Sequence, residues 1–310
     1  MARVRVSRVI VAVSSGLLIA ACGSSSSGGG SDGRIAAVGA ENEYANVISQ
    51  IGGRYVKASA IMSNPNTDPH SFEASPSVAR TVSEAKIVVQ NGVGYDDFMT
   101  KIESASPDAS RNVIDVQKLL GLPDSTSNPH LWYKPTTMPA VARALVSDLS
   151  TLQPAHAAYF RANARRFNAS LQPWLAALEA FRIRHPGTTV ATTEPVSDYM
   201  LEAAGIRDVT PFSMQADIMN GTDPAPQAVT QQNAVLAGHR VMVFVYNRQV
   251  TDTVTQNFLK AATNAGVPVV GVYETMPTPG YTYQSWMMAE LQAIERAVTH
   301  RTSTESLGVR

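Results

Sequence analysis

The chain is organised around the stretch Asn64-Pro65-Asn66-Thr67-Asp68-Pro69-His70-Ser71-Phe72. An apolar, β-branched run from Tyr55 to Met62 precedes it, and a helix-like segment from Ser75 to Ala85 follows it. Two prolines, two asparagines and an aspartate between such segments are typical of a loop at the end of a strand. Pro69 fixes its own φ and biases Asp68 towards extended conformations, so His70 leaves the loop at a defined angle. Because ligands of open α/β sheets bind beyond the carboxyl ends of strands, His70 is a candidate binding residue; the alternative is a solvated loop histidine.

A second loop repeats this arrangement in Asn128-Pro129-His130-Leu131-Trp132. Its Asn-Pro-His core matches the Asp-Pro-His core of the first loop, and it also lies just before a helix-like segment. The repetition favours a shared binding role for His70 and His130.

Strand-like and helix-like runs alternate in two blocks, which indicates parallel sheets with covering helices. In the first block we expect strands over 34–39, 55–62, 86–90 and 111–116, with helices over 43–51, 75–85 and about 95–104. In the second block we expect strands over 188–193, 207–212, 240–246 and 267–273, with helices over 195–204, 226–237, 253–265 and 285–300.

Between the blocks, Pro154 to His185 carries no convincing strand and predicts one long helix. Pro154 suits a first helical turn, and about thirty residues would span ~45 Å. Pro173 inside this segment predicts a kink, and the alternative is two helices broken near Pro173. The expected fold is therefore α/β, with two similar lobes, each a parallel sheet flanked by helices, joined by one long rigid helix across an interlobe cleft.

Potential metal ligands follow the strands of both blocks. His70 and His130 follow strands of the first block, whereas Glu194 and Glu274 follow strands of the second. Two imidazoles and two carboxylates facing one cleft would form a site for a divalent first-row transition metal. Asn247 ends a further strand, where it either lines the cleft or forms a strand-ending turn.

The first 21 residues are typical of a targeting segment, with a basic start and an apolar run too short to span a bilayer comfortably. Cys22 is the only cysteine, which excludes an intramolecular disulfide and thiolate metal sites. Ser24 to Gly33 is almost entirely Ser and Gly and is expected to be a flexible tether. We therefore expect five segments: signal peptide 1–21, tether 22–33, N-terminal lobe 34–153, linking helix 154–185 and C-terminal lobe 186–310.

The charges of the chain are balanced, with 25 Lys and Arg against 25 Asp and Glu. Neither a basic stripe nor an acidic tail is present in the sequence, so we expect no nucleic-acid partner and a monomer.

The chain resembles the metal-binding solute-binding proteins of bacterial zinc and manganese ABC importers, the cluster A-I group. Asp68-Pro69-His70-Ser71-Phe72-Glu73 and Asn128-Pro129-His130-Leu131-Trp132 resemble the two histidine motifs of the family. Glu194 stands at the position of its third ligand, often histidine, and Glu274 at that of a terminal Asp or Glu. The predicted long helix resembles the rigid helix that joins the family's lobes.

The resemblance implies a metal receptor of the cell envelope and not an enzyme. Small residues before Cys22 resemble a lipobox, which implies cleavage there, lipidation of Cys22 and anchoring to the outer face of the cytoplasmic membrane. Such a periplasmic or cell-surface lipoprotein would capture Mn²⁺ or Zn²⁺, with Fe²⁺ also compatible, and deliver it to the membrane permease of an ABC importer.

The sequence also departs from the family pattern. Lys134 falls where the family usually has Asp, so either a helix cap or an acceptor near the metal ligands is expected to be missing. Glu194 in place of histidine, and the absence of a His-rich acidic loop from the sequence, favour manganese. Two alternatives remain open at this point: a secreted zinc hydrolase, whose His-Glu-x-x-His motif is missing, and a surface adhesin.

Overall fold

The computed structural model describes residues 1–2, 33–66, 69–277 and 279–308. Arg34–Arg310 forms one compact unit, distinct from Met1–Gly33. Most of the expected signal peptide, Cys22, and the tether except Gly33 lie outside the described residues, as do Thr67 and Asp68 of the first histidine loop. Among the described residues, we find no helix with the length and apolar character needed to cross a membrane.

The first block forms a parallel sheet in the strand order β2-β1-β3-β4. Its helices cover both faces of the sheet, and Ser75 caps α2 by accepting a hydrogen bond from the Val78 N–H, as a serine at this position is expected to do. The elements are β1 (Ile35–Glu41), α1 (Asn42–Gly52), η1 (Gly53–Tyr55), β2 (Val56–Met62), η2 (Pro69–Ser71), α2 (Pro76–Ser83), β3 (Ile87–Gln90), α3 (Asp97–Ala105), β4 (Asn112–Asp115), α4 (Val116–Leu119) and η3 (Leu131–Tyr133).

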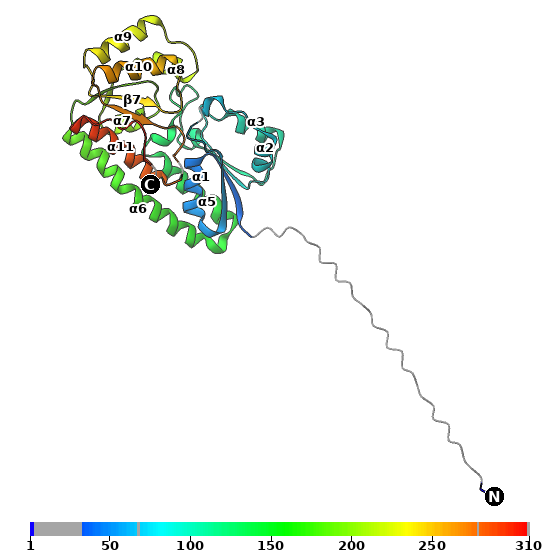
Figure 1. Ribbon diagram of the computed structural model, residues 1–310. Coiled ribbons are helices and arrows are strands. Elements are labelled where there is room, and N and C mark those ends of the chain that lie inside the picture. Colours follow the sequence, from blue (N-terminus) through cyan, green and yellow to red (C-terminus); the bar gives the residue numbers. More distant parts are fainter. Residues whose placement is uncertain (3–32, 67–68, 278, 309–310) are drawn as a thin grey trace. The chain divides into compact units, whose positions relative to one another are not determined.

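The second block repeats this topology in the order β6-β5-β7-β8, again with parallel pairing (Figure 1). The predicted fold class is thereby confirmed. The elements are β5 (Thr189–Thr192), α7 (Asp198–Ala203), β6 (Arg207–Asp208), α8 (Phe212–Met219), α9 (Pro226–Ala237), β7 (Val243–Asn247), α10 (Thr253–Asn264), β8 (Val269–Val272) and α11 (Tyr283–His300).

The apolar strands are buried on both faces, which is typical of parallel sheets. In β7, Val243 and Val245 join the large core that both blocks share, whereas Phe244 and Tyr246 point into the separate core under α8, α9 and α10. This alternation follows from the two-residue period of a strand. Helices on each face therefore hold the carboxyl ends of the strands in fixed positions.

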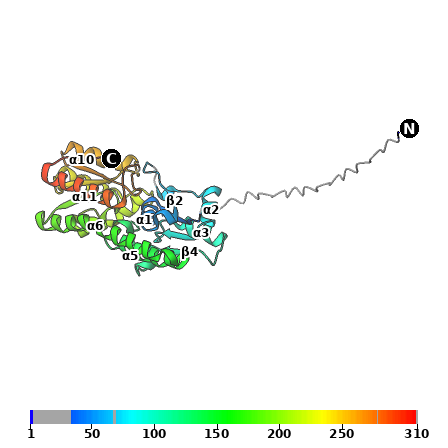
Figure 2. The ribbon, with the colours of Figure 1, turned by 90° about the horizontal axis from the view of Figure 1, so that it is seen from below.

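The last helix of the first block is α5 (Thr137–Leu152), and the linking segment that follows it consists of η4 (Pro154–His156) and α6 (Ala157–Arg184). α6 contacts α1 and α5 of the first block and α7 and α11 of the second, and it runs along one side of the molecule (Figures 1 and 2). Pro173 lies inside one continuous helix. The alternative of two helices broken near Pro173 was therefore wrong.

Two predicted elements of the second block differ from the structure. The expected strand 207–212 is paired only over Arg207–Asp208, because Pro211 has no N–H for a sheet and the unpredicted helix α8 starts directly after it. The expected helix 195–204 begins only at Asp198, since the backbone first makes a turn in which the Asp198 N–H donates to Pro195.

Candidate metal centre

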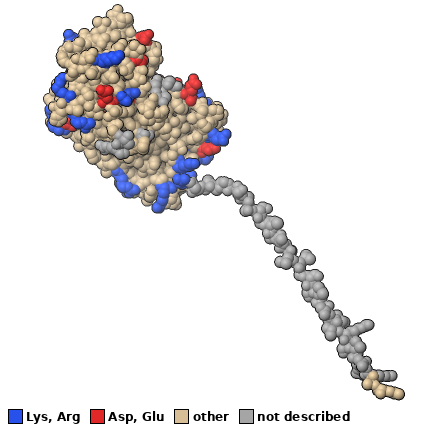
Figure 3. Space-filling model, viewed as in Figure 1, with Lys and Arg blue, Asp and Glu red and all other residues tan. Residues whose placement is uncertain are grey.

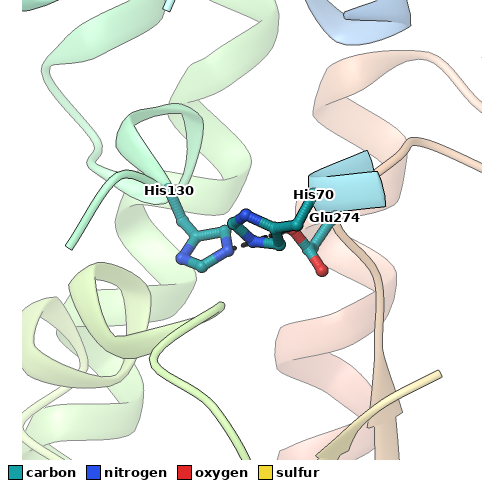
Figure 4. A group of neighbouring side chains, drawn as sticks. All are labelled: His70, His130 and Glu274. Atoms are coloured by element: carbon teal, nitrogen blue, oxygen red, sulfur yellow. Dashed lines mark hydrogen bonds and ion pairs between the residues drawn. The ribbon is translucent and has the colours of Figure 1, made fainter. Parts of the chain in front are cut away.

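His70 and His130 are placed by short 3₁₀ turns, η2 after strand β2 and η3 after helix α4. His70 is the middle residue of η2, after β2, and His130 directly precedes η3. Glu274 lies two residues after β8, in the second block. Figure 4 shows these three side chains pointing toward one another from separate elements.

One carboxylate oxygen is the meeting point of the two imidazoles. His70 Nε2 and His130 Nε2 each lie 3.2 Å from Glu274 Oε2. Ligand atoms of the three residues all lie within 4.8 Å of one another, which is a spacing that a single metal ion could bridge. His130 and Glu274 are fully buried, whereas the His70 side chain is 20% exposed.

The tautomer of His130 is set by Asn128. Asn128 Nδ2 donates to the Pro195 carbonyl, so its Oδ1 is the acceptor that lies 2.9 Å from His130 Nδ1. A neutral His130 therefore carries its proton on Nδ1 and presents the Nε2 lone pair to the site, as a metal-bound histidine does. From the sequence we expected a helix cap or an acceptor near the ligands to be missing, because Lys134 replaces the Asp of the family pattern. In the structure, Asn128 is an acceptor for His130. The Lys134 ammonium instead lies 5.0 Å from the ring centroid of Tyr199.

Glu274 is held by hydrogen bonds to both its backbone and its side chain. Gln249 Oε1 accepts from the backbone N–H groups of Glu274 and Thr275 at 2.7 and 2.8 Å. The Tyr95 hydroxyl donates to Glu274 Oε2 at 2.9 Å, and Asn247 Nδ2 donates to Oε1 at 2.6 Å. These contacts fix the direction in which the carboxylate points.

The electrostatics of the three residues favour a bound cation. Burial alone raises the pKa of Glu274, but the hydrogen bonds and charges of His130 and His70 hold that pKa well below its ordinary value. Burial lowers the pKa of His130, which favours the neutral ring. Positive charge on the imidazoles lowers the pKa of Glu274, whereas burial disfavours that charge on His130, so a metal ion 3.2 Å or less from these atoms could supply the positive charge in place of the imidazole protons.

Glu194 lies beside this group but is not part of it. Asn247 Nδ2 donates to Glu194 Oε1 at 3.1 Å as well as to Glu274, so one amide joins the two carboxylates. Glu194 is buried, with 3% of its surface exposed. The structure therefore brings three of the four predicted residues together. The fourth, Glu194, is linked to them through the side chain of Asn247.

Our sequence analysis missed Tyr95 and Gln249, and it left Asn247 undecided. The Tyr95 ring packs edge-on against His70 at 5.0 Å, and it also contacts Trp132. Its only sequence signal is the Gly92-Val93-Gly94 turn directly after a predicted strand. Asn247 contacts Glu274 and therefore lines the site, which was one of the two interpretations that the sequence left open.

Two further buried carboxylates lie at the end of β1. Glu41 and Glu43 are at most 1% exposed, and their carboxylate oxygens make no hydrogen bond within the described part of the chain. Burial raises the pKa of both groups well above its ordinary value, which favours their neutral forms. Glu41 and Glu43 are therefore expected to add little negative charge to the surroundings of Glu274.

Known proteins resemble this chain in sequence. The manganese-binding lipoprotein MntA of Bacillus subtilis is 27% identical over 49% of this chain and 51% of its own length. MntA of Halalkalibacterium halodurans is 25% identical over 67% of this chain and 70% of its own length. The chain thus spans about half the length of the first of these relatives.

Solved structures share the fold. The periplasmic zinc-binding protein TroA of Treponema pallidum superposes with a TM-score of 0.73 at 17% identity, covering 86% of this chain and 100% of its own. FpvC of Pseudomonas aeruginosa in complex with Mn²⁺ gives a TM-score of 0.70 at 21% identity, covering 86% of this chain and 99% of its own.

The model of one protein family, ZnuA, described as the periplasmic component A of a zinc-uptake complex, matches residues 38–297. This range includes all of both sheets except the first three residues of β1, together with α6 and all four predicted ligands. Members of this family are metal-binding transport proteins and not enzymes, so the zinc hydrolase alternative was wrong. The chain therefore belongs to the ZnuA family of periplasmic metal-binding components.

Proposed function

We propose that this protein is an extracytoplasmic receptor that captures Mn²⁺ or Zn²⁺ and delivers it to the permease of an ABC importer. The observation that carries the proposal is the convergence of His70 Nε2 and His130 Nε2 on one oxygen of Glu274. Two imidazole nitrogens and a carboxylate oxygen are donors that suit both ions. The metal is the cargo of the protein.

The proposed ligands are His70, His130, Glu274 and Glu194. Glu194 would complete a four-donor set by turning its carboxylate away from Asn247, its present hydrogen-bond donor. A site filled by four protein donors leaves no position for a reactive water, which suits capture better than catalysis.

Relatives support both candidate metals. The two MntA proteins are named for manganese and TroA for zinc, and FpvC was solved with Mn²⁺. Carboxylate donors favour manganese, whereas the intrinsic affinity order favours zinc. A direct competition between equal concentrations of the two ions would rank them.

The test is metal analysis and thermal unfolding of the body, Arg34–Arg310, purified without chelator. We expect about one metal per chain, and at 100 times the Kd the ion should stabilise the fold by about 2.7 kcal/mol. His70→Ala and His130→Ala should each weaken binding by more than about 100-fold, since each removes a donor atom. His300→Ala, at an exposed residue of α11, is the control. Unchanged affinity in both ligand variants would contradict the assignment.

We also propose the segment plan expected from the sequence, with a signal peptide over 1–21, a lipidated Cys22, a tether over 22–33, lobes over 34–153 and 186–310, and a linking helix over 154–185. The names of the MntA relatives as lipoproteins support the anchor. Mass spectrometry of the membrane-extracted protein should find diacylglycerol on Cys22, and Cys22→Ala should release the protein from the membrane fraction.

A further inference from the structure

One end of the body carries a group of exposed cationic side chains, which we call the basic end. It lies where β1 and β2 begin side by side, with Ile35 paired to Val56. Its members are Arg34, Arg54, Lys57, Arg161, Arg165 and Arg166, all of them exposed.

Contacts between η1 and the start of α6 join these residues into one surface. The Arg54 guanidinium lies 4.9 Å from the ring centroid of Tyr55 and 5.4 Å from that of Tyr159. The His156 ring stacks on Tyr55 with 3.8 Å between centroids. The first turns of α6 therefore lie directly beside the start of β2.

Few acidic side chains offset the basic end. The first acidic residue of α6 is Glu179, well beyond its arginines. Nearby, Lys86 before β3 is already paired with Asp108 at 3.1 Å. Figure 3 shows Lys and Arg side chains at the lower end of the body, where the dark blue start of β1 lies in Figure 1. An excess of positive charge on one face favours an anionic partner.

We propose that the basic end lies on anionic phospholipid headgroups of the membrane that carries the protein. This orientation rests on the proposed lipid anchor at Cys22. Eleven residues lie between Cys22 and Arg34, so the twelve Cα-to-Cα steps that join them span at most about 43 Å. A tether of this length limits how far the start of β1 can move from the membrane, and it lets the basic end come within the distance of about 8 Å over which charges act at physiological salt.

This orientation would leave the metal centre accessible from the medium. The basic end lies at the amino ends of β1 and β2, whereas His70 follows the carboxyl end of β2. A body resting on its basic end therefore turns the partly exposed ligand His70 away from the bilayer. Electrostatic contact is reversible and weakens with salt, so the body remains free to leave the surface.

The test uses the body, Arg34–Arg310, which contains all three hydrophobic cores and lacks Cys22. Its binding is measured by co-sedimentation with vesicles of phosphatidylcholine containing about one third phosphatidylglycerol, and with pure phosphatidylcholine. We expect binding only to the anionic vesicles, and its loss as salt rises. The triple variant Lys57→Gln, Arg161→Gln, Arg165→Gln should lower the partition coefficient about 100-fold.

The control variant Arg207→Gln, Arg240→Gln, Lys260→Gln removes the same charge from exposed residues of the second block. It should bind anionic vesicles as the unaltered body does, and both variants should keep their metal-induced stabilisation. Equal binding to both vesicle types, or an equal loss in both variants, would overturn the proposal. Absent vesicle binding would also overturn it, in favour of an acidic protein surface as partner. Because the body lacks Cys22, none of these results depends on lipidation, which the mass spectrometry above tests separately.

Discussion

The protein should lose stability as the pH rises, because Glu290 is buried where the two blocks meet, and replacing Glu290 by glutamine should remove this loss. Tyr133 Oη lies 2.7 Å from the Tyr273 carbonyl oxygen and 2.6 Å from Glu290 Oε2. A phenol has one proton, so the Tyr133 hydroxyl cannot donate to the Tyr273 carbonyl and to an ionised Glu290 at the same time. Both contacts are satisfied together when Glu290 is protonated and donates to Tyr133.

The pKa of Glu290 agrees with this assignment. Burial raises the pKa of Glu290 from its ordinary 4.5 to about 8. Hydrogen bonds from Tyr133 and Trp286 to the ionised carboxylate lower this pKa, but by less than burial raises it. Because the folded pKa lies above the unfolded one, the proton stabilises the folded state fully below about pH 4.5, and this contribution is lost as the pH rises to about 8. The difference between the two pKa values corresponds to about 5 kcal/mol for this fully buried group.

A glutamine imitates the neutral acid at every pH, with a donor for Tyr133 and an acceptor for Trp286. The assay is urea unfolding of the metal-free body with and without Glu290→Gln at about pH 5, 6, 7 and 8. The variant should gain about 1.4 kcal/mol per pH unit relative to the unaltered body. Glu202→Gln, the same substitution at an exposed residue, is the matched control. Parallel curves for Glu290→Gln and the unaltered body would refute the reasoning.

Three further substitutions test the surroundings of the site. Asn247→Ala removes the donor shared by Glu274 and its neighbouring carboxylate, and metal titration should show an affinity lower by about 10- to 100-fold. Asn42→Ala removes two buried hydrogen bonds to the Met276 backbone, which join the end of β1 to the segment after Glu274, and urea unfolding should show a loss of about 1–3 kcal/mol. Ser75→Ala removes the α2 cap and should cost about 1 kcal/mol while metal affinity stays unchanged.

Much of the fold was predictable because its elements carry local signals. The buried strand at Val243–Asn247 is nearly all apolar, and Pro226 at the start of α9 fixes that boundary. The second block misled us where tertiary contacts decide the structure. Pro211 sets a limit to any strand over residues 207–212, but no local signal shows that pairing already stops at Asp208, opposite Val190 of β5.

The site was predictable only in part, for a similar reason. His70 and His130 lie in motifs whose prolines and asparagines can be read locally. Tyr95, Asn247 and Gln249 act through partners far away in the sequence: the Tyr95 hydroxyl reaches Glu274 across 179 positions. A tyrosine after a glycine turn resembles many surface residues, so the contact of Tyr95 with Glu274 becomes visible only when the segments that follow β3 and β8 are brought together in the fold.

The distribution of charge over the two blocks bears on how a metal could be both held and released. The first block contributes imidazoles, and burial favours the neutral form of His130. The second contributes the ionised Glu274, whereas Glu41 and Glu43 of the first block are buried, which favours their neutral forms. With neutral imidazoles, a divalent ion bound by Glu274 alone would keep one uncompensated positive charge in a buried site, which is costly. A second carboxylate ligand would cancel that charge, and this is the role proposed for Glu194. Glu194 would hold the metal when it turns away from Asn247, and it would favour release of the metal when it returns to Asn247.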